Sequence, residues 1–185
     1  MAQFNSYIDN IDTDFWQNLC KSRGQLRHYD KGEVFITAGD VGRYIGYIES
    51  GTLKYVCYSS DGTPLVVGLE FAGHFVCDFP GSLYRQKSRC SIIATVPCEI
   101  YCIPSAEVAE LMRSDEKISQ IIETSTRELF YTLYDRFVDI YSKSPQQRYD
   151  ELLHLDPNLF QLFSLKDIAS LLNITPTHLS RLRKK

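Results

Sequence analysis

The sequence predicts an α+β protein with an N-terminal antiparallel β-roll, a long helix and a C-terminal helix-turn-helix. Three observations support this. Short runs of alternating apolar and aromatic residues, separated by glycines, fill the chain before about residue 103. A stretch without proline or glycine covers residues 115–141, and residues 144–185 contain several marked helix starts. We place the domains at 1–112 (roll), 113–143 (long helix) and 144–185 (helix-turn-helix).

The strand-like region follows a short helix expected around residues 14–21. Its apolar runs are EVFI, YIGYI, TLKYVCY and LVVGLEF. The segment SSDGTP contains Asp61-Gly62, which is a strong signal for a tight hairpin. Many short strands between turn signals are typical of an antiparallel barrel or roll.

Two apolar stripes run along the long helix over residues 115–141. The first has the alternating four- and three-residue steps of a coiled coil. We predict it as the seam of a symmetric dimer, formed by Ile122, Thr126, Leu129, Leu133, Arg136 and Ile140. The second stripe contains Phe130, Tyr134, Phe137 or Val138, and Tyr141. One stripe can pack on the chain's own roll, and the other then needs a different partner.

Capping residues mark the expected helix starts in the second half of the chain. Ser105 is expected to cap a short helix, SAEVAELMRS. The pairs Ser144-Pro145, Asp156-Pro157 and Thr175-Pro176 each place a capping residue before a proline at the first helical position. Ser164 with Asp167 resembles a capping box. These signals predict helices over residues 145–155, 157–163, 165–172 and from 176 to near the end.

The last two of these helices have the pattern of a helix-turn-helix. Ala169 supplies the small residue at which the second helix crosses the first, and Asn173 tolerates the left-handed backbone that the turn needs. The apolar residues at inward offsets are Ile168, Leu172, Ile174, Leu179 and Leu182. The second helix is then left with a polar and basic outer face, as a helix that enters the major groove requires.

Positive charge concentrates on this motif. The chain has a formal net charge of −3, but residues 164–185 carry +4 and the rest carries −7. This asymmetry indicates that the end of the chain meets an anion. We expect Thr177, His178 and Arg181 to read bases. The other residues expected at the nucleic acid, mainly as phosphate contacts, are Ser164, Lys166, Ser180, Arg183, Lys184 and Lys185.

Together the three regions resemble the Crp/Fnr family of bacterial transcription regulators over nearly the whole chain. KGEVFITAGDVGRYIGYIESGTLKYVCYSSDG is similar to the first strands of the family's cyclic-nucleotide-binding-type roll, and SLKDIASLLNITPTHLSRLRKK to its helix-turn-helix. The tail is especially similar to short members from Bacteroidetes. The resemblance implies a homodimer that binds double-stranded DNA at a two-fold symmetric operator. RNA polymerase is a further implied partner if the protein activates transcription.

One stretch departs from the family members that bind cyclic AMP. Those members carry Gly-Glu and later Arg-Ser, whereas GHFVCDFPGSLYRQKSRCSIIA has Cys77-Asp78 and the reversed Ser88-Arg89. Neighbouring strand residues point to opposite faces, so the reversal turns the arginine away. We therefore expect no binding of cyclic AMP, and either another small-molecule effector or none. The candidate effector residues are Asp78, Arg85, Lys87, Ser88 and Arg89.

Two alternative interpretations are a ligand-sensing module that acts through protein partners and a cupin-type metalloenzyme. The six cysteines form no CxxC pair and the four histidines form no HxH motif, so we predict no metal site. No nucleophile–base spacing or phosphate-binding loop is apparent, which argues against catalysis. The sequence also shows no signal peptide and no membrane-spanning stretch, and we expect a cytoplasmic protein without membrane partners.

Overall fold

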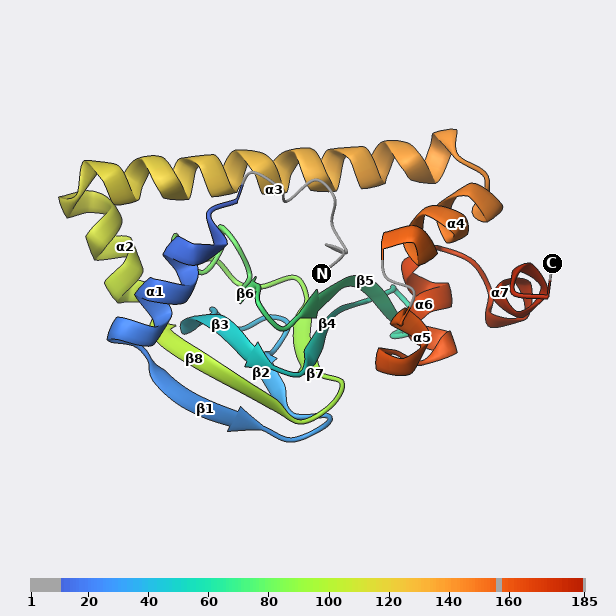
Figure 1. Ribbon diagram of the computed structural model, residues 1–185, viewed down its shortest axis with the longest axis horizontal. Helices are drawn as coiled ribbons and strands as arrows, with labels where there is room; N and C mark the ends of the chain where they lie inside the picture. Colours follow the sequence, from blue (N-terminus) through green and yellow to red (C-terminus); the bar gives the residue numbers. More distant parts are fainter. Residues whose placement is uncertain (1–10, 156–157, 185) are drawn as a thin grey trace. The chain divides into compact units, whose positions relative to one another are not determined.

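The computed structural model describes residues 11–155 and 158–184, and the chain divides into two compact units. The roll unit comprises residues 12–123, and the described part of the helical unit comprises residue 11 with residues 124–155 and 158–184. Figure 1 shows the strands in the first unit and helices α4 to α7 in the second. Helix α3 (Glu116–Ser142) begins in the roll unit and continues into the helical unit.

The strands of the roll unit form two antiparallel sheets, with strand orders β1-β8-β3-β6 and β2-β7-β4-β5 (Figure 1). Their bounds are β1 Gln25–Tyr29, β2 Val34–Ile36, β3 Tyr44–Ser50, β4 Thr52–Tyr58, β5 Pro64–Phe71, β6 Phe75–Val76, β7 Ser91–Ala94 and β8 Cys98–Pro104. Among these pairs, only β4 and β5 are consecutive in sequence. The pairing of distant strands is that of a roll, so the predicted antiparallel roll is confirmed.

Inward-facing side chains of both sheets build the roll core. Leu53 of β4, Ile92 of β7 and Ile100 of β8 are all fully buried. At Gly46 of β3, a Cβ atom would lie 2.5 Å from the Cγ2 of Ile100, so this close approach requires glycine. Gly62 has φ of 81° in the turn between β4 and β5, where the sequence predicts a hairpin. The turn and the alternation of inward-facing residues thus set the pairing of β4 with β5.

Buried cysteines contribute to the roll unit. Cys20, Cys77, Cys98 and Cys102 are buried, and every cysteine is a free thiol. Burial deprives the thiolate of water, which raises the pKa of Cys20 to about 12 and that of Cys102 to about 11. Among the described residues, no group of three or more His, Cys, Asp or Glu side chains is placed to hold a metal ion.

Helix α1 (Thr13–Arg23) contacts β3 and β8, and its Trp16 is fully buried against Phe75, with ring centroids 4.9 Å apart. Helix α2 covers Ser105–Ser114. The prediction that Ser105 caps α2 is wrong, because Pro104 occupies the cap position and Ser105 is the first helical residue. The Ser105 hydroxyl instead donates a hydrogen bond to the backbone oxygen of Gly42 at 2.9 Å.

Most helix starts in the helical unit lie where their capping residues predict. Ser144 precedes α4 (Pro145–Leu155) and forms a reciprocal capping box with Gln147. The later helices are α5 (Leu159–Leu162), α6 (Leu165–Leu171) and α7 (Pro176–Leu182). Helix α5 is shorter than the predicted 157–163, and the predicted cap at Asp156-Pro157 lies outside the described residues. None of the described helices is both long and apolar enough to cross a membrane.

Candidate nucleic-acid interface

Helices α6 and α7 form a helix-turn-helix whose turn is a Schellman motif. Asn173 has φ of 53°, the left-handed conformation predicted for this position. The N–H of Asn173 donates to the oxygen of Ser170 at 2.9 Å, and that of Ile174 donates to the oxygen of Ala169 at 3.0 Å. These two bonds are the pair that closes a helix end in this motif. The side chain of Asn173 is exposed, so its backbone conformation explains its place in the turn.

A small apolar core joins the two helices. Ile168 and Ala169 of α6 are fully buried, and so is Leu179 of α7. Leu172 and Leu182 are also buried, while Ile174 in the turn is only half-buried. The inward-facing set expected from the sequence is therefore the buried set, with Ile174 less covered than the rest.

Two side-chain caps fix where the helices of the motif begin. The hydroxyl of Thr175 accepts a hydrogen bond from the N–H of His178 at 3.1 Å, and Pro176 is the first residue of α7. The hydroxyl of Ser164 accepts from the N–H of Asp167 at 3.1 Å and donates to the Asp167 carboxylate at 2.7 Å. Because each start is fixed, the outward-facing positions of each helix are fixed as well.

The outer surface of the motif is polar and basic. The predicted base readers Thr177, His178 and Arg181 are all exposed on α7. Of the other predicted contacts, Ser164, Lys166, Arg183 and Lys184 are exposed, Ser180 is half-buried, and Lys185 lies outside the described residues. The structure brings the described residues together on one motif, and their contact with nucleic acid stays a prediction.

Arg183 has a packing partner that the sequence pattern did not reveal. Its guanidinium carbon lies 4.3 Å from the ring centroid of Phe160 in α5, a cation–π contact. Phe160 lies beside Tyr149 of α4, with ring centroids 6.3 Å apart. Arg183 is therefore exposed to solvent and also links the end of α7 to neighbouring helices of the same unit.

Helix α3 carries a broad exposed apolar face. Phe130, Tyr134, Phe137 and Tyr141, the second stripe, are 54% to 78% exposed. Of the six residues predicted as the dimer seam, Leu133 and Ile140 are exposed, Thr126, Leu129 and Arg136 are half-buried, and Ile122 is 2% exposed. The aromatic stripe is therefore exposed at all four positions, and only part of the predicted seam shares its exposure.

The candidate effector residues lie between β6 and β7 of the roll unit. Asp78 is half-buried, and burial raises the pKa of its carboxyl although a hydrogen bond from Ser88 opposes the shift. Ser88 is buried whereas Arg89 is exposed, but both residues precede β7, so the alternation of a strand, on which the expectation from the sequence rested, does not apply to them. Arg85 and Lys87 are exposed too. No predicted cation of this segment is buried beside Asp78.

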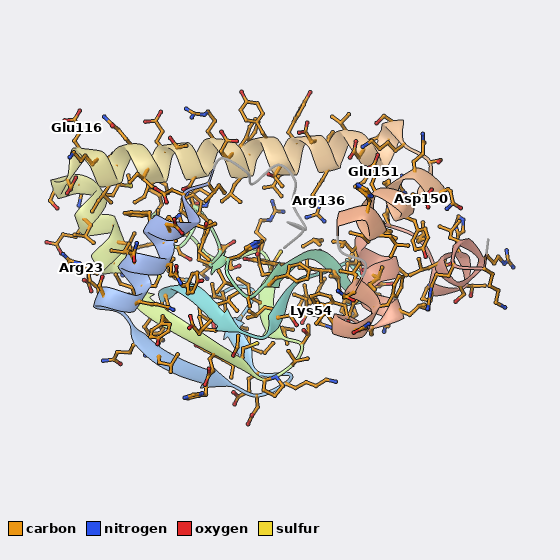
Figure 2. All side chains as sticks on the ribbon, viewed as in Figure 1. Arg23, Lys54, Glu116, Arg136, Asp150 and Glu151 are labelled. Atoms are coloured by element: carbon orange, nitrogen blue, oxygen red, sulfur yellow. The ribbon has the colours of Figure 1, made fainter. Side chains whose placement is uncertain are left out.

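Two basic residues at the joint between α3 and α4 were missed by the sequence reasoning. The Nζ of Lys143 lies 3.0 Å from Oδ2 of Asp139 and 2.8 Å from Oε2 of Glu151, which is labelled on α4 in Figure 2. The four-residue spacing of Asp139 and Lys143 is a usable helical signal. The other residue, Arg148, donates to backbone carbonyl groups that folding brings beside it. No spacing in the sequence signals these contacts.

Comparisons with known proteins agree with this architecture. The family model of the cyclic nucleotide-binding domain matches residues 26–115. FixK2 from Bradyrhizobium japonicum superposes with a TM-score of 0.75 at 14% identity, over 87% of this chain and 83% of that one. A protein from Eubacterium rectale, described as a Crp/Fnr family transcriptional regulator, gives 0.72 at 15% identity, over 98% and 86%.

A third similar structure is the c-di-GMP-responsive global regulator CLP of Xanthomonas campestris. It gives a TM-score of 0.69 at 16% identity, and the match covers 94% of this chain and 90% of that one. At such identities the likeness is one of fold. Curated protein sequences yield no match to the chain.

Proposed function

We propose that this chain, which has the fold of the Crp/Fnr regulators and whose residues 26–115 match the cyclic nucleotide-binding domain family, is a homodimeric, DNA-binding transcription regulator. The observation that carries the proposal is the helix-turn-helix with a buried apolar core and an exposed polar and basic face on α7. The protein is not an enzyme in this proposal, and RNA polymerase becomes a partner if it activates transcription.

Charge supports DNA as the partner of this face. Exposed cations at Lys166, Arg181 and Lys184 sit on the most basic segment of an otherwise acidic chain. Arginine can bind guanine O6 and N7 with two hydrogen bonds, whereas lysine suits phosphate. We assign base reading to Arg181, with Thr177 and His178, and phosphate contacts mainly to the lysines.

The exposed aromatic stripe of α3 supports a homodimer. Four large aromatic side chains on one side of a helix form a face that a second copy can cover symmetrically. We propose that the seam is centred on Phe130, Tyr134 and Phe137, with Leu133 and Ile140 at its side. Two reading heads joined in this way would contact half-sites about one helical turn apart.

The roll unit is proposed to act as a sensor that does not bind cyclic AMP. A cation beside a cyclic phosphate would stabilise it through charge-assisted hydrogen bonds. The arginine of the Ser88-Arg89 pair is exposed, however, and the buried member is the serine. The half-buried Asp78 would repel the phosphate further. An effector, if one binds, would therefore be a different small molecule.

Selection from a random duplex DNA pool tests this function directly. The purified protein should enrich a two-fold symmetric site. Its affinity should fall steeply as the salt concentration rises, because the lysine and arginine side chains that bind phosphates displace counterions from the DNA. Arg181→Ala with Lys184→Ala should abolish enrichment. Arg113→Ala with Lys117→Ala, which removes equal charge from exposed positions outside the motif, should not.

Two results would contradict the proposal. Enrichment that depends on neither Arg181 nor Lys184 would remove the assigned interface. No enrichment at any salt, with or without a small-molecule extract, would favour the alternative module that acts through protein partners.

A further inference from the structure

We propose that Arg148 is a positioning residue that sets the angle between α3 and the reading head formed by α6 and α7. The inference rests on the proposed function, because the angle matters only if α3 joins two DNA-reading heads. Arg148 lies in α4, far from the exposed face of α7 in sequence, and we assign it no contact with DNA.

One guanidinium joins the C-terminal ends of two helices. Its Nη1 donates to the backbone oxygen of Lys143 at 2.6 Å, with longer contacts to Ile140 at 3.3 Å and Asp139 at 3.5 Å. Its Nη2 donates to the backbone oxygen of Leu172 at 3.1 Å. The first set lies at the end of α3, and Leu172 is the C-cap residue of α6.

Helix ends explain why an arginine suits this place. The last carbonyl groups of a helix have no partner within the helix and carry partial negative charge. A planar, permanently charged guanidinium can serve two such ends at once, and its fork fixes their mutual direction. The Nε of Arg148 is buried without a hydrogen-bond partner among the described residues, so the two terminal nitrogens make its contacts.

The contact also reaches the turn of the reading head. Leu172 immediately precedes Asn173, whose left-handed backbone redirects the chain from α6 towards α7. Lys143 supports the same joint by bridging Asp139 of α3 and Glu151 of α4. An angular change at α3 is therefore passed through Arg148 to the residues that aim α7.

This role has a specific consequence for DNA recognition. Moving two half-sites apart by one base pair shifts them by about 3.4 Å and rotates them by about 35°. A rigid joint rejects that change, whereas a loose joint adapts to it. Arg148 should therefore govern how strictly the dimer selects half-site spacing, and not only how tightly it binds.

Operators with the selected spacing, one base pair more and one base pair less would test this. The parent should lose about 10-fold or more in affinity at the altered spacings, and Arg148→Gln should lose only about 3-fold or less. A merely stabilising residue would lower affinity for all three operators by the same factor. An unchanged spacing ratio in Arg148→Gln overturns the inference, and Arg113→Gln is the charge-matched control.

Two additions separate this inference from the proposed function. Arg148→Lys keeps the charge and the stem but cannot reproduce the two-armed fork, so it should show the same relaxed spacing if Arg148→Gln fails to fold. Without DNA, spin labels on unnatural residues at positions 127 and 178 should give a broader distance distribution in either variant than in the parent. An unchanged distribution refutes the role of Arg148 even if the protein binds DNA, whereas a parent that binds no DNA refutes the proposed function.

Discussion

Replacing Asn173 by alanine isolates the left-handed turn of the helix-turn-helix. A residue with a Cβ pays roughly 1–2 kcal/mol in this region, asparagine less, and glycine nothing. Because the Asn173 side chain is exposed, its contacts add little. Asn173→Ala should therefore lower the free energy of unfolding of the helical unit by about 1 kcal/mol. Asn173→Gly should change it by less than about 0.5 kcal/mol, and Asn173→Val should cost more than alanine.

Urea unfolding monitored by circular dichroism measures these differences. For a domain of this size, 1 kcal/mol also corresponds to a shift of about 4–8 °C in Tm. Trp16 is the single tryptophan and lies in the roll unit, so its fluorescence follows that unit separately and should not change. Gln161→Ala, at an exposed position of α5, controls for the loss of a polar side chain.

The order of the three variants decides the question. If the alanine and glycine variants were both as stable as the parent, the backbone conformation would not account for asparagine at position 173. If both were less stable than the parent by the same amount, a contact of the asparagine side chain would account for it instead.

Further expectations concern DNA, assembly and pH. Arg181→Ala should cost about 1–3 kcal/mol at the selected site and relax base preference there, while Lys184→Ala should weaken all sequences alike; equal binding of every sequence by parent and Arg181→Ala would refute base reading. Phe137→Lys should halve the mass in light scattering, and an unchanged mass would exclude this seam. Burial would lower the pKa of His74, but Glu70, with its Oε2 at 3.2 Å from Nδ1, outweighs it and the pKa is raised. The contribution of this pair to stability is complete below the ordinary histidine pKa of 6.5 and is lost as the pH rises through the raised pKa of the folded state. The free energy of unfolding should therefore fall from pH 6 to 8 in the parent but not in His74→Gln.

The features that the sequence predicted well are local ones. The Asp61-Gly62 hairpin and the caps at Ser144 and Thr175 depend on residues within three or four positions of one another. The outer face of α7 could be predicted because helix geometry places it opposite the buried Leu179 and Leu182.

The features that it missed depend on distant partners. Serine is a residue type that often caps helices, but the hydroxyl of Ser105 donates to the backbone oxygen of Gly42, and Pro104 occupies the cap position. Arg148 bonds to Leu172 24 positions away, which no periodic pattern encodes. The stripe on α3 was ambiguous because spacing alone does not show which side a helix leaves open, and the exposure of Phe130 and Phe137 makes that distinction.

The buried thiols of the roll unit can report the local opening of its elements. A thiol-modifying reagent can reach Cys20 in α1, or Cys98 and Cys102 in β8, only when that element opens. Since β8 lies between β1 and β3, its two cysteines should react at the rate of global unfolding, while Cys20 should also report undocking of α1 alone. Mass spectrometry of time-resolved alkylation would thus give an opening free energy for each element in the unaltered chain. A small molecule that selectively slowed one of these reactions would be identified as an effector. The cysteine that it protects would show which part of the roll it stabilises.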